Sequence, residues 1–118
     1  MPEAETSVCW PEAMTPGAVA VIFVSQRTGA DDEGYAAASD EMVRLASAMP
    51  GFISVDSVRS FDGLGITVSY WADEEAAVAW RNEANHAMIR EAGRRHWYEW
   101  YRLSVTKNLR CYDWRRSS

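Results

Sequence analysis

The two histidines of this chain are its first candidates for acid–base chemistry. One of them, His86, follows Trp80 by six positions. An imidazole titrates near neutral pH, so a positioned histidine can take a proton from a substrate. An indole offers a flat surface on which an aromatic ligand stacks. The pair therefore indicates proton abstraction from a flat aromatic compound. A structural alternative places Trp80 in the core and leaves His86 half-buried, bonded to Asn82 or Arg90.

Three more residues are candidates for binding a ligand. Trp71 and Tyr101 are expected to fill the interior of the fold and line a ligand site, because aromatic side chains dominate such cavities. Arg94 is predicted either to neutralise an anionic ligand or to bond the last carbonyls of the preceding helix. His96, in the segment RRHW, is expected to face solvent.

Several other chemistries are not expected. Two cysteines, Cys9 and Cys111, make neither a disulfide framework nor a zinc site, and we expect both to be reduced thiols. With two histidines no metal site is expected. Phosphate loops, dinucleotide fingerprints and a Ser-His-Asp arrangement are not found in the sequence.

Length and composition indicate one domain. The 118 residues divide into a polar segment, 1–16, predicted to be a flexible N-terminal tail, a folded domain, 17–114, and a basic tail, 115–118. No apolar run is long enough to span a membrane, and the N-terminus lacks the pattern of a signal peptide, so a cytoplasmic location is expected.

The net charge of −5 is unevenly distributed. Residues 90–118 hold eight Lys or Arg against three Asp or Glu, so the rest of the chain is strongly acidic. We expect the two regions to face each other within one subunit or across a dimer, with an anionic ligand near Arg94 and Arg95 as the alternative. Nucleic acid is not an expected partner, because the protein as a whole is acidic and carries no nucleic-acid-binding motif.

The elements that position these side chains follow from hydrophobic periodicity and turn signals. Asp62-Gly63 between two β-rich runs predicts a hairpin, and Asp73 predicts a helix N-cap. The order is βαββαβ, a ferredoxin-like α+β fold with an antiparallel sheet. The predicted elements are strand Ala18–Gln26, a helix from about Glu33 to Ala48, strands Phe52–Phe61 and Leu64–Trp71, helix Asp73–Ala92, and one or more strands over Tyr98–Trp114.

The second helix is predicted to run unbroken and to stop at Gly93. On a continuous helix, His86 would lie about 120° around the axis from Trp80, at the edge of the buried stripe. That stripe is expected to contain Ala76, Ala77, Trp80, Ala84, Ala87 and Met88, while Met42 and Met49 are expected to fill the core.

A second copy of the chain is the expected protein partner. Strand one is apolar at every position from Val19 to Val24, which suggests burial on both faces. Two helices on one face of a four-stranded sheet leave the other face uncovered, and an apolar face of that size needs a partner. Face-to-face packing of two sheets would form a homodimeric α/β barrel.

Several short stretches resemble the antibiotic biosynthesis monooxygenase family over residues 18–114. They are Pro50–Ser57, Ser69-Tyr70-Trp71 with the acidic helix cap, Ala79-Trp80-Arg81, His86, Gly93-Arg94, and Trp97-Tyr98 with Tyr101. The resemblance implies a homodimeric α/β barrel. It also implies a monooxygenase that acts on a small aromatic or hydrophobic substrate without a cofactor, or else a non-catalytic binder of such molecules.

The heme-degrading branch of that family offers a third possibility. Its pattern has an Asn late in the first strand, a Trp on the second helix and a heme-ligating His ten residues later. Here the Trp is Trp80, the Asn position falls on Gln26, and the His position falls on Arg90. A guanidinium has no lone pair for iron, so heme would require non-standard ligation by His86.

Overall fold

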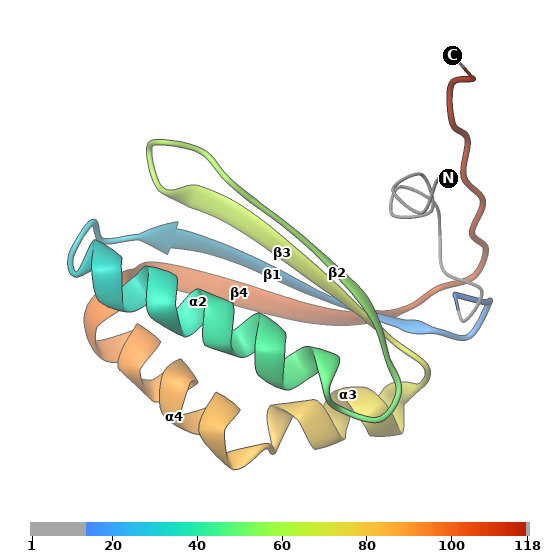
Figure 1. Ribbon diagram of the computed structural model, residues 1–118, viewed down its shortest axis with the longest axis horizontal. Coiled ribbons are helices and arrows are strands. Elements are labelled where there is room, and N and C mark those ends of the chain that lie inside the picture. Colours follow the sequence, from blue (N-terminus) through green and yellow to red (C-terminus); the bar gives the residue numbers. More distant parts are fainter. Residues whose placement is uncertain (1–13, 118) are drawn as a thin grey trace.

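The computed structural model describes residues 14–117 and confirms the ferredoxin-like α+β fold. One antiparallel sheet has the strand order β2-β3-β1-β4, and helices α2, α3 and α4 cover one of its faces (Figure 1). The elements are β1 Val19–Arg27, α2 Asp32–Ser47, β2 Phe52–Arg59, β3 Leu64–Trp71, α3 Glu74–Arg81, α4 Ala84–Ala92, a π-helix Gly93–Trp97, and β4 Tyr98–Lys107.

Local capping and turn signals fix the ends of these elements as predicted. Asp73 caps α3, its carboxylate accepting from the N–H of Ala76 at 2.9 Å. Gly63 in the hairpin between β2 and β3 has a φ of 100°, in the left-handed region that glycine occupies without a Cβ clash. Gly51 turns the chain from α2 into β2 with a φ of 85°.

The prediction of one continuous second helix is wrong. Helix α3 ends at Arg81, and α4 starts after Glu83, whose backbone is extended and whose carboxylate accepts from the N–H of His86 at 2.9 Å. The α-helix does end at Ala92 with Gly93 as its C-cap, as predicted, but the φ of Gly93, −61°, is helical and the chain continues as a π-helix. A Cβ there would come within 2.9 Å of the Tyr98 ring, so the glycine serves close packing.

Two strands are shorter than predicted. Strand β4 stops at Lys107, which pairs with Val19 at the start of β1, so no partner strand remains for the residues that follow. Residues 108–117 have no regular structure and extend away from the sheet (Figure 1). Strand β2 stops at Arg59, and Phe61 lies exposed in the hairpin turn.

The core lies between the sheet and helices α2 and α3. Its buried members are Val19, Ala46, Trp71, Ala77 and Trp80, and Met42 and Met49 pack against them as predicted. Met88, predicted for the buried stripe, is 71% exposed because the break before α4 changes the direction of that helix.

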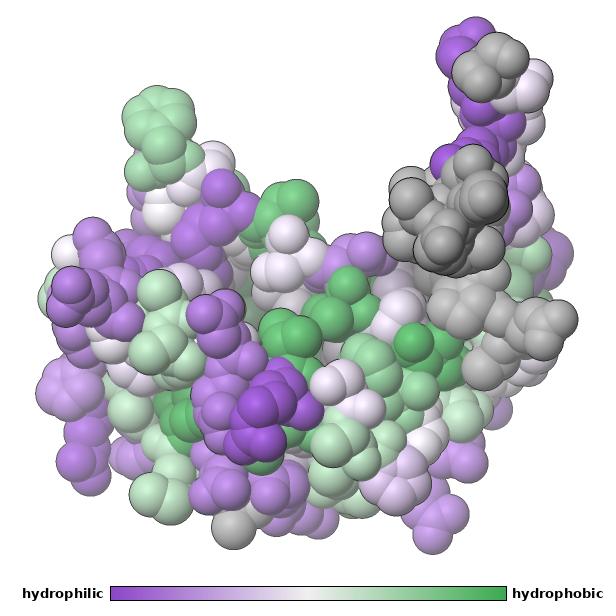
Figure 2. Space-filling model, viewed as in Figure 1, coloured by the Kyte–Doolittle hydropathy of each residue, from purple (hydrophilic) through white to green (hydrophobic). Residues whose placement is uncertain are grey.

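Residues 14–117 leave the sheet face away from the helices uncovered. Strand β1, predicted to be buried on both faces, is therefore covered on one. Apolar side chains on the uncovered face, such as those of Val58, Leu64, Ile66 and Trp100, remain exposed. Figure 2 shows the surface falling away between the β2–β3 hairpin and the C-terminal segment, with apolar side chains in the depression.

Within residues 14–117, no helix combines the length and apolar character needed to cross a membrane. Met14, placed in the predicted tail, is buried. Cys9 lies outside the described residues, so a contact between it and Cys111 is not tested, whereas the Cys111 thiol is free.

Candidate active-site cavity

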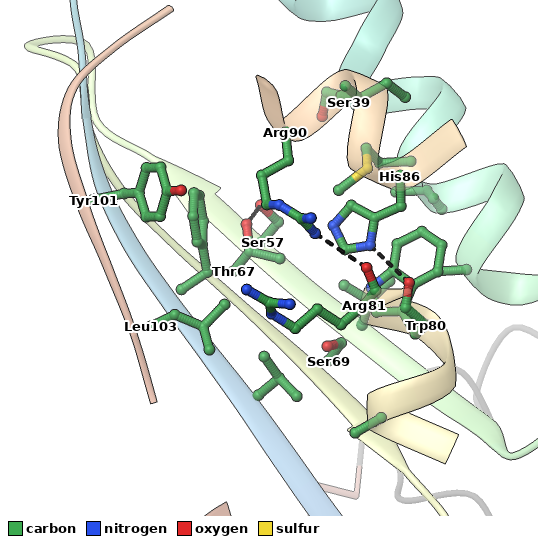
Figure 3. Close-up of a pocket in the computed structure, with 18 of the residues that line it drawn as sticks. Ser39, Ser57, Thr67, Ser69, Trp80, Arg81, His86, Arg90, Tyr101 and Leu103 are labelled. Atoms are coloured by element: carbon green, nitrogen blue, oxygen red, sulfur yellow. Dashed lines mark hydrogen bonds between the residues drawn. The ribbon is translucent and has the colours of Figure 1, made fainter. Parts of the chain in front are cut away.

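A cavity of about 330 Å³ lies between the helical layer and the sheet (Figure 3). All four strands and all three α-helices contribute side chains to its lining, and most of these side chains are apolar. Of the predicted site residues, Trp80, His86 and Tyr101 line this cavity. Its size and apolar lining are those of a site for a small organic molecule.

Helix α3 ends where Trp80 and His86 meet. The two rings lie nearly parallel, with centroids 4.0 Å apart and an interplanar angle of 23°. The same imidazole bonds through Nδ1 to the backbone carbonyl of Trp80 at 2.9 Å. Carbonyls in the last turn of a helix lack intrahelical donors, and His86 supplies one from the next helix.

This contact determines which nitrogen of His86 carries the hydrogen. A carbonyl oxygen can only accept, so Nδ1 is the donor and Nε2 of the neutral ring keeps its lone pair. Burial lowers the pKa of His86, and the nearby guanidiniums of Arg90 and Arg81 lower it as well; the bond to the Trp80 carbonyl and the charge of Glu83 act in the opposite direction. The net effect is a ring that is neutral at pH 7 and presents an unprotonated nitrogen.

Trp71 lies behind Trp80 and does not line the cavity. Its ring is fully buried and stacks on Trp80 at a centroid distance of 5.9 Å and an angle of 23°. Phe52 packs edge-on against Trp71 at 5.5 Å. The column Phe52–Trp71–Trp80–His86 therefore fixes the orientation of the cavity wall.

Hydroxyl groups on the sheet form the polar part of the cavity floor. Ser57 on β2 and Thr67 on β3 are hydrogen-bonded across the strands at 2.7 Å. Ser69, two residues further along β3, accepts from the Trp71 indole N–H at 2.9 Å. These hydroxyls rotate freely and can orient a hydroxyl or carbonyl of a bound molecule.

The opposite wall is aromatic. The Tyr101 ring packs against Phe23 at 5.1 Å and against Tyr98 at 5.9 Å, and Tyr35 meets Tyr98 edge-on at 6.0 Å. Burial raises the pKa of Tyr98 far above its usual value, so its phenol stays protonated. The Tyr98 phenol can therefore donate or accept a hydrogen bond but does not act as a base near pH 7.

Two predicted ligand-binding residues point elsewhere. Gln26 donates to the backbone carbonyl of Asp62 at 2.9 Å and supports the hairpin. Arg94 donates to the Tyr101 hydroxyl at 2.7 Å and pairs with Glu91, so it holds Tyr101 from outside the cavity. The lining of the cavity includes neither residue.

Two arginines line the cavity that the sequence did not single out as binding residues. Arg81 ends α3, and Arg90 on α4 donates to the Arg81 backbone carbonyl at 3.1 Å. Figure 3 shows both guanidiniums projecting into the cavity, with Arg90 beside His86. Arginines nine residues apart look like solvated surface charges on a continuous helix. The helix break brings them together.

The residues present do not reproduce the heme-ligating pattern. Arg90 occupies the position of the ligating histidine, and it projects a cation into the cavity. Within the described part of the chain, no group of three or more His, Cys, Asp or Glu side chains is placed to hold a metal ion.

Comparison with known proteins agrees with this fold. The chain is 46% identical over 92 residues to the uncharacterized protein YqjZ of Bacillus subtilis, a match that spans 78% of this chain and 80% of that one. Among solved structures, it is similar to SnoaB, a cofactor-independent oxygenase from Streptomyces nogalater, with a TM-score of 0.66, 14% identity, and 86% and 96% of the two chains covered.

A third similar protein is Rv0793 of Mycobacterium tuberculosis, with a TM-score of 0.66, 18% identity, and 86% and 99% of the two chains covered. At these identities the two solved structures support the fold alone. The model of the antibiotic biosynthesis monooxygenase family matches residues 18–92, which include β1, Trp80 and His86. This chain belongs to the antibiotic biosynthesis monooxygenase family.

Proposed function

We propose that the protein is a cofactor-independent monooxygenase that acts on a small aromatic substrate in the cavity, with His86 as the general base. The observation that carries the proposal is the anchored imidazole. Its Nδ1 is held by the Trp80 carbonyl, so the neutral ring keeps a lone pair on Nε2 beside an aromatic wall. A base of this kind typically contributes 10²- to 10⁴-fold to a rate.

The reaction needs an acidic C–H or O–H on an electron-rich ring. His86 takes the proton, and the resulting carbanion or phenolate gives electrons to O₂ with formation of a carbon–oxygen bond. The imidazolium returns the proton to the peroxide anion, and loss of water leaves a carbonyl. One oxygen atom stays in the product, the other leaves as water, and O₂ is the only oxidant. SnoaB, which shares the fold, is named as a cofactor-independent oxygenase.

The substrate is expected to stack on the aromatic side chains of the opposite wall, such as Tyr101 and Phe23, and to direct a polar group at the floor hydroxyls. Stacking adds about 0.5–1.5 kcal/mol beyond the burial of apolar area. The His86 imidazole cannot tilt easily, because Trp80 supports one of its faces and Trp71 in turn supports Trp80. The reacting atom is thereby held near the imidazole, as general-base catalysis requires.

Oxygen uptake with anthrone as the probe tests this proposal. Anthrone has an acidic ring C–H, and its conversion to anthraquinone with O₂ releases one water. Wild-type protein should consume O₂ above the rate in buffer, with one ¹⁸O atom from labelled O₂ in the product. His86→Ala should lower the rate by roughly 10²- to 10⁴-fold. His96→Ala, at an exposed position, should not change it.

Binding of anthrone without oxygen uptake would contradict the proposal. It would leave the alternative of a passive binder of hydrophobic molecules. If His86→Ala bound anthrone more weakly but turned over each bound molecule at the wild-type rate, His86 would not be the base. A Soret-shifted complex on titration with hemin, lost in His86→Ala, would favour the heme alternative.

We also propose that two copies pair through their uncovered sheet faces, and that the protein works in the cytoplasm. The exposed apolar side chains of that face support pairing. Light scattering after size exclusion should give a dimer for the wild type. Ile66→Lys, on the uncovered face, should give a monomer, whereas Ala37→Lys, on the exposed side of α2, should not. A wild-type monomer at micromolar concentration would contradict the barrel.

A further inference from the structure

The cavity carries two arginines, and no ion pair within residues 14–117 joins either of them to a carboxylate. Arg81 and Arg90 both line it, and the carboxylate in its lining, Glu74, lies two helical turns before Arg81, about 10 Å along the axis of α3. Among residues 14–117 no ion pair joins Glu74 to either arginine. The nearer carboxylate on α4, Glu91, pairs with Arg94 and Arg95 on the outer side.

The donors of the two guanidiniums are largely unused. Arg90 gives one N–H to the Arg81 carbonyl at 3.1 Å, out of the five that a guanidinium holds. The side chain of Arg81 makes no hydrogen bond or ion pair within the described residues. Figure 3 shows it reaching from α3 across the cavity, toward Leu103 and Thr67 on the sheet.

Holding two like charges at one opening costs free energy unless an anion lies between them. Guanidiniums match carboxylates well, because their paired N–H groups fit the two oxygens. The cavity wall includes the aromatic rings of Tyr98 and Tyr101, which suit a flat apolar body. The cavity therefore combines an apolar lining with two guanidiniums whose donors are largely unused. This combination suits a molecule that has both an apolar body and an anionic group.

We infer that the ligand of this cavity is an aromatic acid, with its ring against the aromatic lining of the cavity and its carboxylate held by Arg81 and Arg90. The inference rests on the proposed function only in taking the same cavity as the substrate site. It replaces Arg94, the arginine expected from the sequence, with two others. It also gives the substrate a direction, because a carboxylate at the arginines places the ring beside Nε2 of His86.

The test uses two probes of the same ring and similar size, 2-naphthoate with a charged carboxylate and 2-naphthamide with a neutral amide. Calorimetric titration of the wild-type protein should show naphthoate binding tighter on the order of tenfold, as charge-assisted hydrogen bonds exceed neutral ones. Arg81→Gln and Arg90→Gln should each reduce this preference, and the double variant should abolish it with little change for naphthamide. High salt should narrow the preference in the wild type.

Arg95→Gln is the matched control. It removes the same charge from an exposed residue outside the cavity, and should leave the preference intact. If Arg90→Gln fails to fold because the Arg81 carbonyl loses its donor, Arg81→Gln alone carries the test, since the Arg81 side chain makes no hydrogen bond or ion pair with the residues that the structure describes.

Equal affinity for the two probes, no binding of either at about 1 mM, or a preference that survives the double variant would overturn the inference. Both measurements are made without turnover. If the protein prefers naphthoate but does not consume oxygen with anthrone, the monooxygenase proposal is contradicted and the inferred carboxylate site is not.

Discussion

The imidazole of His86 lies 4.0 Å from the indole of Trp80 and is bonded to the backbone carbonyl of the same residue. One residue therefore supplies both the surface on which the ring rests and the acceptor that fixes its tautomer. A structural and a catalytic role for His86 are compatible, because the first uses Nδ1 and the second needs Nε2.

The pKa of His86 predicts how stability depends on pH. Burial lowers this pKa, and the charges that face the ring are Arg90, Arg81 and Glu83. The unfolded chain then binds a proton more readily than the folded one, so the free energy of unfolding falls as pH drops below the unfolded value near 6.5 and levels off below the folded pKa. Thermal melts at pH 7.5 and pH 5 should show a smaller loss for His86→Gln than for the wild type. His96→Gln should behave like the wild type, and an equal loss in all three would contradict the assignment.

Truncation of Trp80 should strongly destabilise the fold. The ring is buried between Trp71 and His86, so Trp80→Ala leaves a cavity and should lower the free energy of unfolding by about 3–5 kcal/mol. Urea denaturation measures the change. Trp114→Ala removes the same side chain from an exposed position and should have an effect within about 0.5 kcal/mol.

The start of α4 depends on a single cap. Glu83→Ala removes the acceptor for the His86 N–H and should lower the free energy of unfolding by about 1 kcal/mol, whereas Glu83→Gln keeps an acceptor oxygen and should lose less. The Ala variant should also slow oxygen uptake, because His86 lies in the first turn of α4, which the Glu83 carboxylate caps. Equal stability of the two variants in urea would show that the carboxylate does not cap the helix.

Two glycines with the same backbone angle separate strain from crowding. Gly29 and Gly51 both have a φ of 85°, but a Cβ at Gly29 meets no atom within 4 Å, whereas one at Gly51 would lie 2.5 Å from the Cβ of Ala76. Gly29→Ala should cost about 1 kcal/mol from the angle alone. Gly51→Ala should cost clearly more, because α3 must move. Equal losses by thermal or urea unfolding would mean that α3 adjusts freely.

Local signals predicted most of the fold. Asp62-Gly63 and Asp73 act through their own backbone and nearest neighbours, so the hairpin and the start of α3 could be recognised from the sequence. The break after Arg81 could not, because residues 74–92 contain neither Pro nor Gly and are rich in Ala and Glu. It is held by contacts between the two helices, from His86 to the Trp80 carbonyl and from Arg90 to the Arg81 carbonyl.

The site was predicted in part for the same reason. Trp80, His86 and Tyr101 were recognised by residue type, and all three line the cavity. Arg81 and Arg90 gain their place from the break, so their spacing carried no signal. Gln26 and Arg94 were expected to bind ligand, but they bond the hairpin and Tyr101 instead.

The joint between α3 and α4 couples the shape of the helical layer to the contents of the cavity. His86 and Arg90 on α4 each donate a hydrogen bond across this joint to a backbone carbonyl at the end of α3. A ligand that draws Arg90 inward competes with the Arg81 carbonyl for the same cation. A ligand in the cavity then weakens the hydrogen bond from Arg90 to the Arg81 carbonyl and changes the angle that α3 and α4 can adopt. Amide hydrogen exchange at Asn82 and Glu83 would report occupancy from outside the cavity.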